Sequence, residues 1–168
     1  PSTKTYIGDC TMFGQAYATM VHKVKSRYPE ADIYVCSMLR WKPKKHDKDK
    51  QYPVVFFMHG FMGNWKLYNG LLKDLEDCIV LCVGTKDWSG RFTKKDVNNL
   101  FKKQIPFLES LGYRVDEDRL HIIGLSNGGT ATNVAYNNFS DKFKTITFIS
   151  TNINQTYPIS SKVLSIGG

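Results

Sequence analysis

The sequence has 168 residues, a length that suits one domain with a sizeable core, or one domain with a short appendage. Hydrophobic residues make up 42% and aromatic residues 13% of the chain, proportions that are ordinary for a globular protein and exclude a disordered one. The formal net charge is +8, and no apolar run approaches the roughly 20 residues of a membrane-spanning helix, so we expect a soluble protein without a membrane span.

The first 41 residues read differently from the rest of the chain. Apolar side chains at helical spacing predict an amphipathic helix there, and the strand "DIYVCSM" follows it. A lysine-rich stretch, "KPKKHDKDK" at 42–50, comes next. A run of this charge suits nucleic acid or anionic lipid, but it more often marks a solvated loop, and no RNA-binding signature accompanies it. We therefore predict an N-terminal helix-strand segment at 1–41, a basic linker at 42–51 and a core at 52–168.

Within the core, short apolar runs alternate with amphipathic stretches. The predicted strands are "YPVVFFM" (52–58), "CIVLCV" (78–83), "RLHIIG" (119–124), "FKTITFIS" (143–150) and "KVLSIG" (162–167), and helices are predicted at 65–76, 93–111 and 127–138. Continuous apolar strands separated by helices indicate a parallel sheet covered on both faces. The predicted fold class is therefore α/β.

Two residues punctuate the predicted helix at 93–111. Pro106 predicts a kink or an early end, because proline removes a backbone donor and clashes with the preceding turn. Gly112 predicts the stop, and the residues from there to 118 read as a polar connection.

The four cysteines, Cys10, Cys36, Cys78 and Cys82, lack the paired spacing of a zinc site. Cys78 and Cys82 fall in one apolar strand, where positions four apart lie about 13 Å from each other, so we expect buried free thiols. A bridge between Cys10 and Cys36 stays open, and the cysteines do not settle the redox compartment. Localisation is left open, with a secreted or periplasmic protein preferred to a cytoplasmic one.

The segment "HIIGLSNGG", at 121–129, places one serine between glycines directly after a predicted strand. Gly124 and Gly128 stand two positions before and two positions after Ser126. Small residues there let a strand turn sharply into a helix and push the serine hydroxyl out above the sheet. The alternative interpretation is a glycine-rich turn of a nucleotide-binding α/β protein.

A second motif, "FFMHGFMGN" at 56–64, follows the first core strand. A glycine-flanked loop at the carboxyl end of a strand presents backbone N–H groups to an oxyanion in acyl transfer. Taken together, His59-Gly60-Phe61 and the serine motif resemble the α/β-hydrolase superfamily, in particular its esterase and polymer-esterase-like branches. The resemblance covers residues 52–168, roughly 70% of the chain.

The resemblance implies roles for individual residues. Ser126 would be the nucleophile, and the backbone N–H groups of Phe61 and Asn127 would form the oxyanion hole, with Gly60 as a motif glycine. His59 belongs to the loop motif and is expected to be a structural hydrogen-bonding group. No metal and no organic cofactor are implied.

Two tryptophans fall where the active-site loops of such a fold gather. Trp65 follows the oxyanion loop, and Trp88 follows the second core strand. They either line a substrate cleft or simply pack against the core.

The sequence departs from the family pattern in its acid and base. In the superfamily these residues follow the strands after the one resembling "FKTITFIS", and here "KVLSIGG" looks like the acid-bearing strand at the end of the given sequence. We therefore expect this chain to stop before the catalytic acid and histidine. The remaining candidates do not match those positions: Asp87, Asp116, Asp118, His22, His46 and His121.

The N-terminal segment departs from the pattern as well. The stretch "FGQAYATMVHKVKSRYPEADIYVCSMLRW" resembles SGNH (GDSL-type) hydrolases, and "IGDCT" resembles their nucleophile block with Cys10 in the place of the serine. That resemblance implies a remnant or fusion piece without chemistry of its own.

The leading hypothesis is a serine hydrolase that cleaves a small-molecule or polymer carboxylic ester through an acyl-enzyme on Ser126. The rival is a non-catalytic truncated hydrolase that acts as a binding module, or a fragment completed by another chain or by a second copy at its exposed sheet edges. A nucleic-acid-binding domain rests on charge alone, so no nucleic-acid partner is expected.

Overall fold

The computed structural model describes Ser26, residues 36–38, 46–61, Leu75 and residues 77–83, 91–154 and 162–167. Among these residues, the centre is a six-stranded sheet with the order β1-β3-β2-β4-β5-β6. The strands are β1 (Cys36–Met38), β2 (Gln51–Met58), β3 (Ile79–Val83), β4 (Arg114–Leu125), β5 (Thr145–Ile149) and β6 (Val163–Ile166). β1 runs antiparallel to β3, and all the other neighbouring pairs are parallel. The predicted α/β class with a mainly parallel sheet is confirmed.

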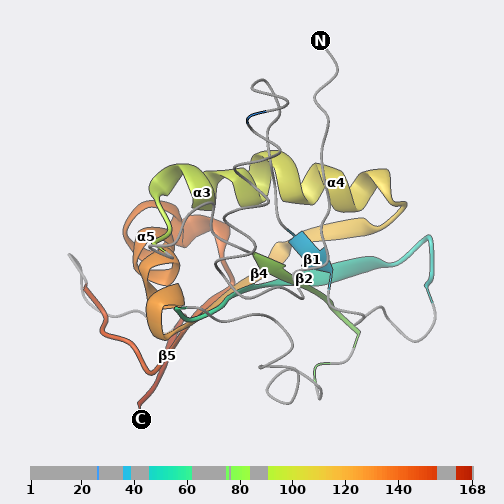
Figure 1. Cartoon of the computed structure of the whole chain (residues 1–168). Coiled ribbons are helices and arrows are strands. Elements are labelled where there is room, and N and C mark those ends of the chain that lie inside the picture. The colour runs from blue at the N-terminus through green and yellow to red at the C-terminus, as the bar shows by residue number, and fades with distance from the viewer. Residues whose placement is uncertain are drawn as a thin grey trace.

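Helices cover one face of this sheet. A continuous helical rod consists of α3 (Lys94–Asn99), the π-helical turn η2 (Leu100–Gln104) and α4 (Ile105–Ser110), and α5 (Gly129–Phe139) lies beside it (Figure 1). Short 3-10 turns flank α5, namely η3 (Ser126–Gly128) and η4 (Ser140–Lys142). The large apolar cluster lies between these helices and the strands, with Phe56, Leu108, Ile122 and Phe148 fully buried. The opposite face carries a smaller cluster around Phe57 and Val80.

The helical rod begins at a capping box and ends at the glycine that is predicted to stop it. The Asp96 N–H donates to the Thr93 hydroxyl, and the Thr93 N–H donates to the Asp96 carboxylate at 2.8 Å, so the two residues form a capping box. Gly112 adopts a φ of +86°, and its N–H donates to the Glu109 carbonyl at 2.9 Å. This left-handed glycine stops the helix as predicted.

The interruption predicted at Pro106 takes the form of a π-helical turn. The Ile105 N–H bonds to the Leu100 carbonyl five residues back, and Pro106 follows in the first turn of α4. The expectation of an early end is wrong, because the helix continues to Ser110.

β4 is longer than predicted. The interpretation of residues 114–118 as a connection is wrong, because Gln51 pairs with Arg114 and Tyr52 pairs with Val115. The register then shifts, and Val54 pairs with Leu120, so the polar residues 116–119 bulge out between two paired stretches. The polarity of these residues is typical of loops, so the sequence pattern does not identify this part of β4 as a strand.

Parts of the predicted organisation lie outside the described residues, including the N-terminal amphipathic helix and all of the predicted helix at 65–76 except Leu75. Cys36–Met38, in the N-terminal segment, pair with β3 and so belong to the same sheet as the core. The division at residues 41 and 51 stays a prediction. Cys78 and Cys82 are buried thiols that belong to no disulfide, as expected.

Candidate active site

Ser126 lies on the turn between β4 and α5. β4 ends at Leu125, η3 spans Ser126–Gly128, and α5 begins at Gly129. The Ser126 backbone has a φ of +51°, a conformation that costs a residue with a β-carbon on the order of 1–3 kcal/mol. Ser126 is exposed, so this sharp turn leaves the serine open to solvent.

The two motif glycines make this turn possible. A β-carbon on Gly124 would lie 2.6 Å from the Gly128 carbonyl oxygen and 2.8 Å from Thr132 Cγ2. A β-carbon on Gly128 would overlap the carbonyl oxygen of Met58 and lie 3.0 Å from that of His59. Gly128 therefore packs directly on the end of β2, and a larger side chain at either position would push the turn away.

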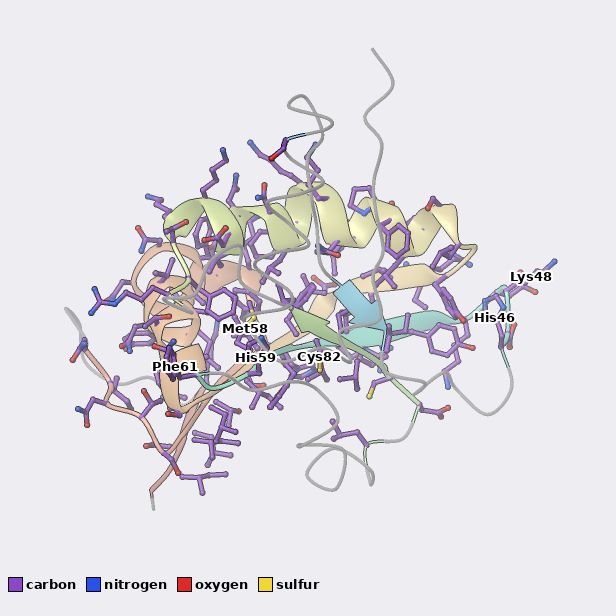
Figure 2. The ribbon with its side chains drawn as sticks, in the orientation of Figure 1. His46, Lys48, Met58, His59, Phe61 and Cys82 are labelled. Carbon is purple, nitrogen blue, oxygen red and sulfur yellow. The ribbon has the colours of Figure 1, made fainter. Side chains whose placement is uncertain are left out.

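This packing brings the serine turn and the His59-Gly60-Phe61 loop to one edge of the sheet. Met58 pairs with Gly124 in parallel register, so β2 and β4 have their carboxyl ends side by side. Figure 2 shows His59 and Phe61 where β2 ends near α5, with His46 and Lys48 at the far end of the strand. Gly60 is buried, whereas the Phe61 side chain is 56% exposed.

His59 has the local bonding expected of a structural residue. Its Nδ1 lies 2.7 Å from the Gly60 carbonyl oxygen, which can only accept, so Nδ1 carries the proton and donates. Burial lowers the pKa of His59, and the bond to Gly60 opposes that shift. His59 thus fixes the loop in its neutral form.

A threonine in the first turn of α5 ties a third segment to this edge. The Thr130 hydroxyl donates to the Asn127 carbonyl at 2.9 Å and accepts from the Phe92 N–H at 3.0 Å. Phe92 is buried and lies just before α3. Thr130 therefore links the start of the helical rod to the residue that follows Ser126.

The other histidines among the described residues lie away from Ser126. His121 is within β4, four residues before its end, and its Nδ1 lies 2.7 Å from the Thr145 hydroxyl oxygen. Burial lowers the pKa of His121, and the charges of Arg119 and Lys144 lower it further. His46 stacks on Tyr113 with ring centroids 4.6 Å apart.

The acidic candidates near β4 serve local structure. Asp116 accepts from Arg119 at 2.6 Å, and this bond is the main cause that lowers the pKa of Asp116. Asp118 is exposed in the same bulge, which lies at the far end of β4 from Ser126. Asp87, His22, Cys10, Trp65 and Trp88 lie outside the described residues, so their predicted roles stay predictions.

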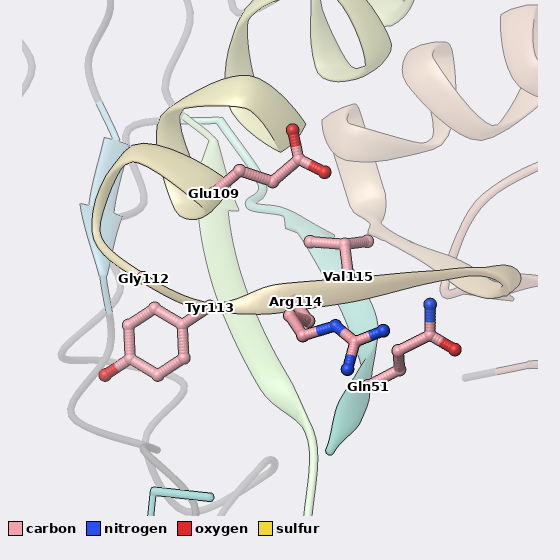
Figure 3. A pocket seen from close by; sticks show the side chains of 6 residues that line it. All are labelled: Gln51, Glu109, Gly112, Tyr113, Arg114 and Val115. Atoms are coloured by element: carbon pink, nitrogen blue, oxygen red, sulfur yellow. The ribbon is translucent and has the colours of Figure 1, made fainter. Parts of the chain in front are cut away.

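A cavity of about 290 Å³ lies at the opposite edge from the serine. Figure 3 shows the residues that line it around the start of β4: Gln51, Glu109, Gly112, Tyr113, Arg114 and Val115. Within the described ranges, no cluster of histidine, cysteine or acidic side chains is placed to hold a metal ion. No helix in that part of the chain has the length and hydropathy to cross a membrane.

Comparison with known proteins places this arrangement in a known fold. The model of the prolyl oligopeptidase family matches residues 83–158, a range that contains the serine turn. The structure is similar to the Bacillus cereus carboxylesterase, with a TM-score of 0.50 and 18% identity over 82% of this chain and 67% of the other. It is similar to a ferulic acid esterase from Anaeromyces mucronatus at the same TM-score and identity, over 75% of this chain and 56% of the other.

The chain has the α/β-hydrolase fold. The resemblance drawn from the two motifs is thereby confirmed at the level of the fold. A thermostable esterase also matches, with 21% identity, a TM-score of 0.47 and coverage of 69% of this chain and 40% of the other. The chain thus spans between 40% and 67% of the length of these three α/β-hydrolase structures. Curated protein sequences give no significant match.

Sequence reasoning missed the polar residues that brace this α/β-hydrolase edge. Thr130, Asn133 and Asn137 all lie on α5 and bond to backbone groups of other segments. Asparagine is a poor residue for a helix interior, so a pair spaced by four in "NVAYN" is a usable signal of side-chain bonding. The partners of the two asparagines outside α5 lie 17 to 21 residues away, and only the fold identifies them.

Proposed function

We propose that this chain is a serine hydrolase that cleaves carboxylic esters through an acyl-enzyme on Ser126. The observation that carries the proposal is the Ser126 turn, with its positive φ and with Gly128 packed on the backbone of Met58 and His59. This geometry suits a nucleophile held above the sheet next to a loop of backbone donors. The fold likeness to a carboxylesterase and a ferulic acid esterase supports the ester as the substrate class.

In the proposed reaction the Ser126 hydroxyl oxygen attacks the ester carbonyl carbon, and its proton passes to a base. The backbone N–H groups of Phe61 and Asn127 stabilise the negative oxygen of the tetrahedral intermediate. The intermediate then collapses, the C–O bond to the alcohol breaks, and the alcohol leaves with a proton. Water attacks the acyl-enzyme in the same way and releases the acid. Esters of small molecules and of polymers both suit this chemistry.

The base is the missing part of this proposal among the described residues. The superfamily resemblance puts the acid and the histidine after the strand at 162–167. A serine without a base keeps little of the rate that a complete triad gives. We therefore expect the 168-residue chain alone to be a very poor esterase. A version of the chain that continues through the next two strands should be at least about a thousandfold faster.

The test is hydrolysis of a short-chain aryl ester by the 168-residue chain and by the extended chain, each with Ser126→Ala. A fluorophosphonate probe reports the same serine by covalent labelling. Ser140→Ala is the matched control, because Ser140 is exposed at the other end of α5. Turnover and labelling of the extended chain that survive Ser126→Ala would contradict the proposal.

A further outcome identifies a different base. Fast turnover by the short chain that Ser126→Ala abolishes would mean that an internal residue or a second chain accepts the proton. His59 is then the first residue to replace, because it is a neutral histidine at the same edge of the sheet.

The second candidate is a non-catalytic module that pairs with another chain. β6 favours it, since Leu164 is 54% and Ile166 46% exposed on this strand, which is the last of the sheet among the described residues. This candidate predicts no labelling of Ser126 in either version of the chain.

A further inference from the structure

Two asparagines of α5 bond to the backbone that follows β5. Asn133 Nδ2 donates to the carbonyl oxygens of Gly129 and Asn152, each at 2.9 Å, and Asn133 Oδ1 accepts from the Asn154 N–H at 2.6 Å. Asn137 Nδ2 donates to the Asn154 carbonyl at 2.9 Å and to the Asn133 carbonyl at 3.0 Å. Three backbone groups of residues 152–154 are thus held by two side chains.

The spacing of these bonds follows from element geometry. Residues four apart on a helix are separated by about 6 Å along its axis, and residues two apart in an extended chain are separated by about 6.6 Å. Asn133 and Asn137 therefore match the backbone polar groups of Asn152 and Asn154, as a neighbouring strand would. An asparagine amide has both donors and an acceptor, so it satisfies N–H and C=O groups alike.

The bonded segment borders the serine turn. A β-carbon on Gly129 would overlap the Thr151 side chain, so Thr151 lies against the residue three positions after Ser126. Ser150 adopts a φ of +49°, and its N–H donates to the Ile166 carbonyl at 2.8 Å. Ile153 packs against the large apolar cluster. The segment 151–154 is thus fixed from three sides at the edge that carries Ser126.

We propose that Asn133 and Asn137 are positioning residues that hold 151–154 as a rigid wall beside Ser126. Thr151 lies against Gly129, three residues after Ser126, and in this proposal the wall limits the size of the group that reaches the serine. The inference rests on the proposed function, because it assigns a specificity role at the same site. Neither asparagine touches the reacting atoms.

The first measurement is hydrogen exchange at the Asn154 amide in the full chain. Asn133→Ala removes the acceptor of this N–H, and exchange should speed up at least tenfold. Asn138→Ala is the matched control, since the exposed Asn138 lies on the same helix and donates within it to the Val134 carbonyl. Thermal unfolding checks that each variant is folded. If Asn133→Ala does not fold, Asn137→Ala replaces it. This variant leaves the acceptor of the Asn154 N–H in place and removes the donor to the Asn154 carbonyl, so faster exchange would then report release of the segment.

The second measurement probes the wall without ester turnover. In a Ser126→Cys background, the thiol reacts with methyl and with benzyl methanethiosulfonate, and peptide mass spectrometry identifies the modified cysteine. Asn133→Ala should raise the ratio of the benzyl to the methyl rate at least fivefold, because a relaxed wall admits the larger group. Asn138→Ala should leave the ratio unchanged.

A rise in both readouts supports the proposal. Exchange that speeds up less than tenfold would show that the asparagines do not hold the segment, and faster exchange with a ratio raised less than fivefold would show that the segment is no wall of the site. Either result overturns the inference. Failure of the proposed function appears separately, as ester turnover that Ser126→Ala leaves intact, and it affects neither readout.

Discussion

Gly128 is the residue that holds the two motifs together. Its α-carbon lies where any β-carbon would overlap the Met58 carbonyl, so the serine turn and the end of β2 are in backbone contact. This backbone contact holds Ser126 in its conformation with a positive φ. A strained residue persists only where its surroundings over-determine it, and here the support is the close packing of a glycine on a strand end.

We predict that Gly128→Ala lowers the free energy of unfolding by about 2–3 kcal/mol, because the strand end and the turn must separate to make room. Urea unfolding measures the change. Gly167→Ala is the control, since a β-carbon there meets no atom within 4 Å. Equal stability of the two variants would show that the turn and the strand end are not in close contact.

His121 gives the fold a dependence on pH. Its pKa is below the ordinary value of 6.5, chiefly because of burial. Below pH 6.5 the unfolded chain therefore binds a proton that the folded chain does not, and the free energy of unfolding falls as the pH falls. His59 acts in the same direction.

We predict that His121→Gln reduces this loss of stability. The measurement is urea unfolding at pH 7.5 and at pH 5.5, and the difference between the two free energies should be smaller in the variant than in the parent chain. His59 remains in both proteins, so part of the loss persists. An identical difference in the two proteins would rule out His121 as a contributor.

At the scale of elements, a hydrogen bond to the Thr130 side chain links α5 to the start of α3. The Phe92 N–H leads into α3, and its acceptor is a side chain of α5. Thr130→Val keeps the shape of the side chain but leaves this donor without the Thr130 hydroxyl. We expect a loss of about 1–2 kcal/mol, the typical cost of an unsatisfied polar group.

Thr132→Val is the matched control for this substitution. Thr132 is a buried threonine of the same helix, and its hydroxyl donates within α5 to the Gly129 carbonyl. Both variants replace threonine by valine in the same helix, so the change in helix propensity is the same. Their difference in the free energy of unfolding therefore measures the bond between the Thr130 hydroxyl and the Phe92 N–H. A Thr132→Val variant that is as destabilised as Thr130→Val would contradict the coupling.

The elements differ in how far the sequence predicts them. Strands such as β2 and β3 are continuous apolar runs because both of their faces are buried, and the sequence places them within one residue of their observed bounds. The start of β4 is polar, since its residues 116–119 bulge from the sheet, and a hydrophobic pattern cannot identify such a strand.

The residues of the candidate site also differ in how far the sequence predicts them. Ser126 and the motif glycines are predictable, because a sharp turn allows few residue types. Asn133 and Asn137 are not, because their role depends on where residues 152–154 lie after the chain has folded.

At the scale of the whole molecule, β6 leaves apolar side chains exposed at the end of the sheet. Val163 packs against the large cluster, so Leu164 and Ile166 face the other side, where they are 54% and 46% exposed. Within the described part of the chain, β5 is the strand that pairs with β6. An apolar strand at such a position is prone to pair with another chain.

We expect the chain to self-associate through this strand, and the double variant Leu164→Lys, Ile166→Lys to lower the association. Sedimentation velocity over a range of protein concentrations measures it. Leu111→Lys is the control, because Leu111 is also 46% exposed but lies just after α4. Association that persists in the double variant and disappears with Leu111→Lys would place the contact elsewhere.

The π-helical turn between α3 and α4 bears on how this chain is aligned with its relatives. The ring closed by the Ile105 N–H on the Leu100 carbonyl contains one residue more than an α-helical ring. A relative with an uninterrupted helix here matches only when its alignment carries a one-residue gap within 100–104. Without the gap, every position on one side of the turn is rotated by about 100° around the helix axis. Buried Val97 and buried Leu108 would not then both be aligned with core residues of the relative.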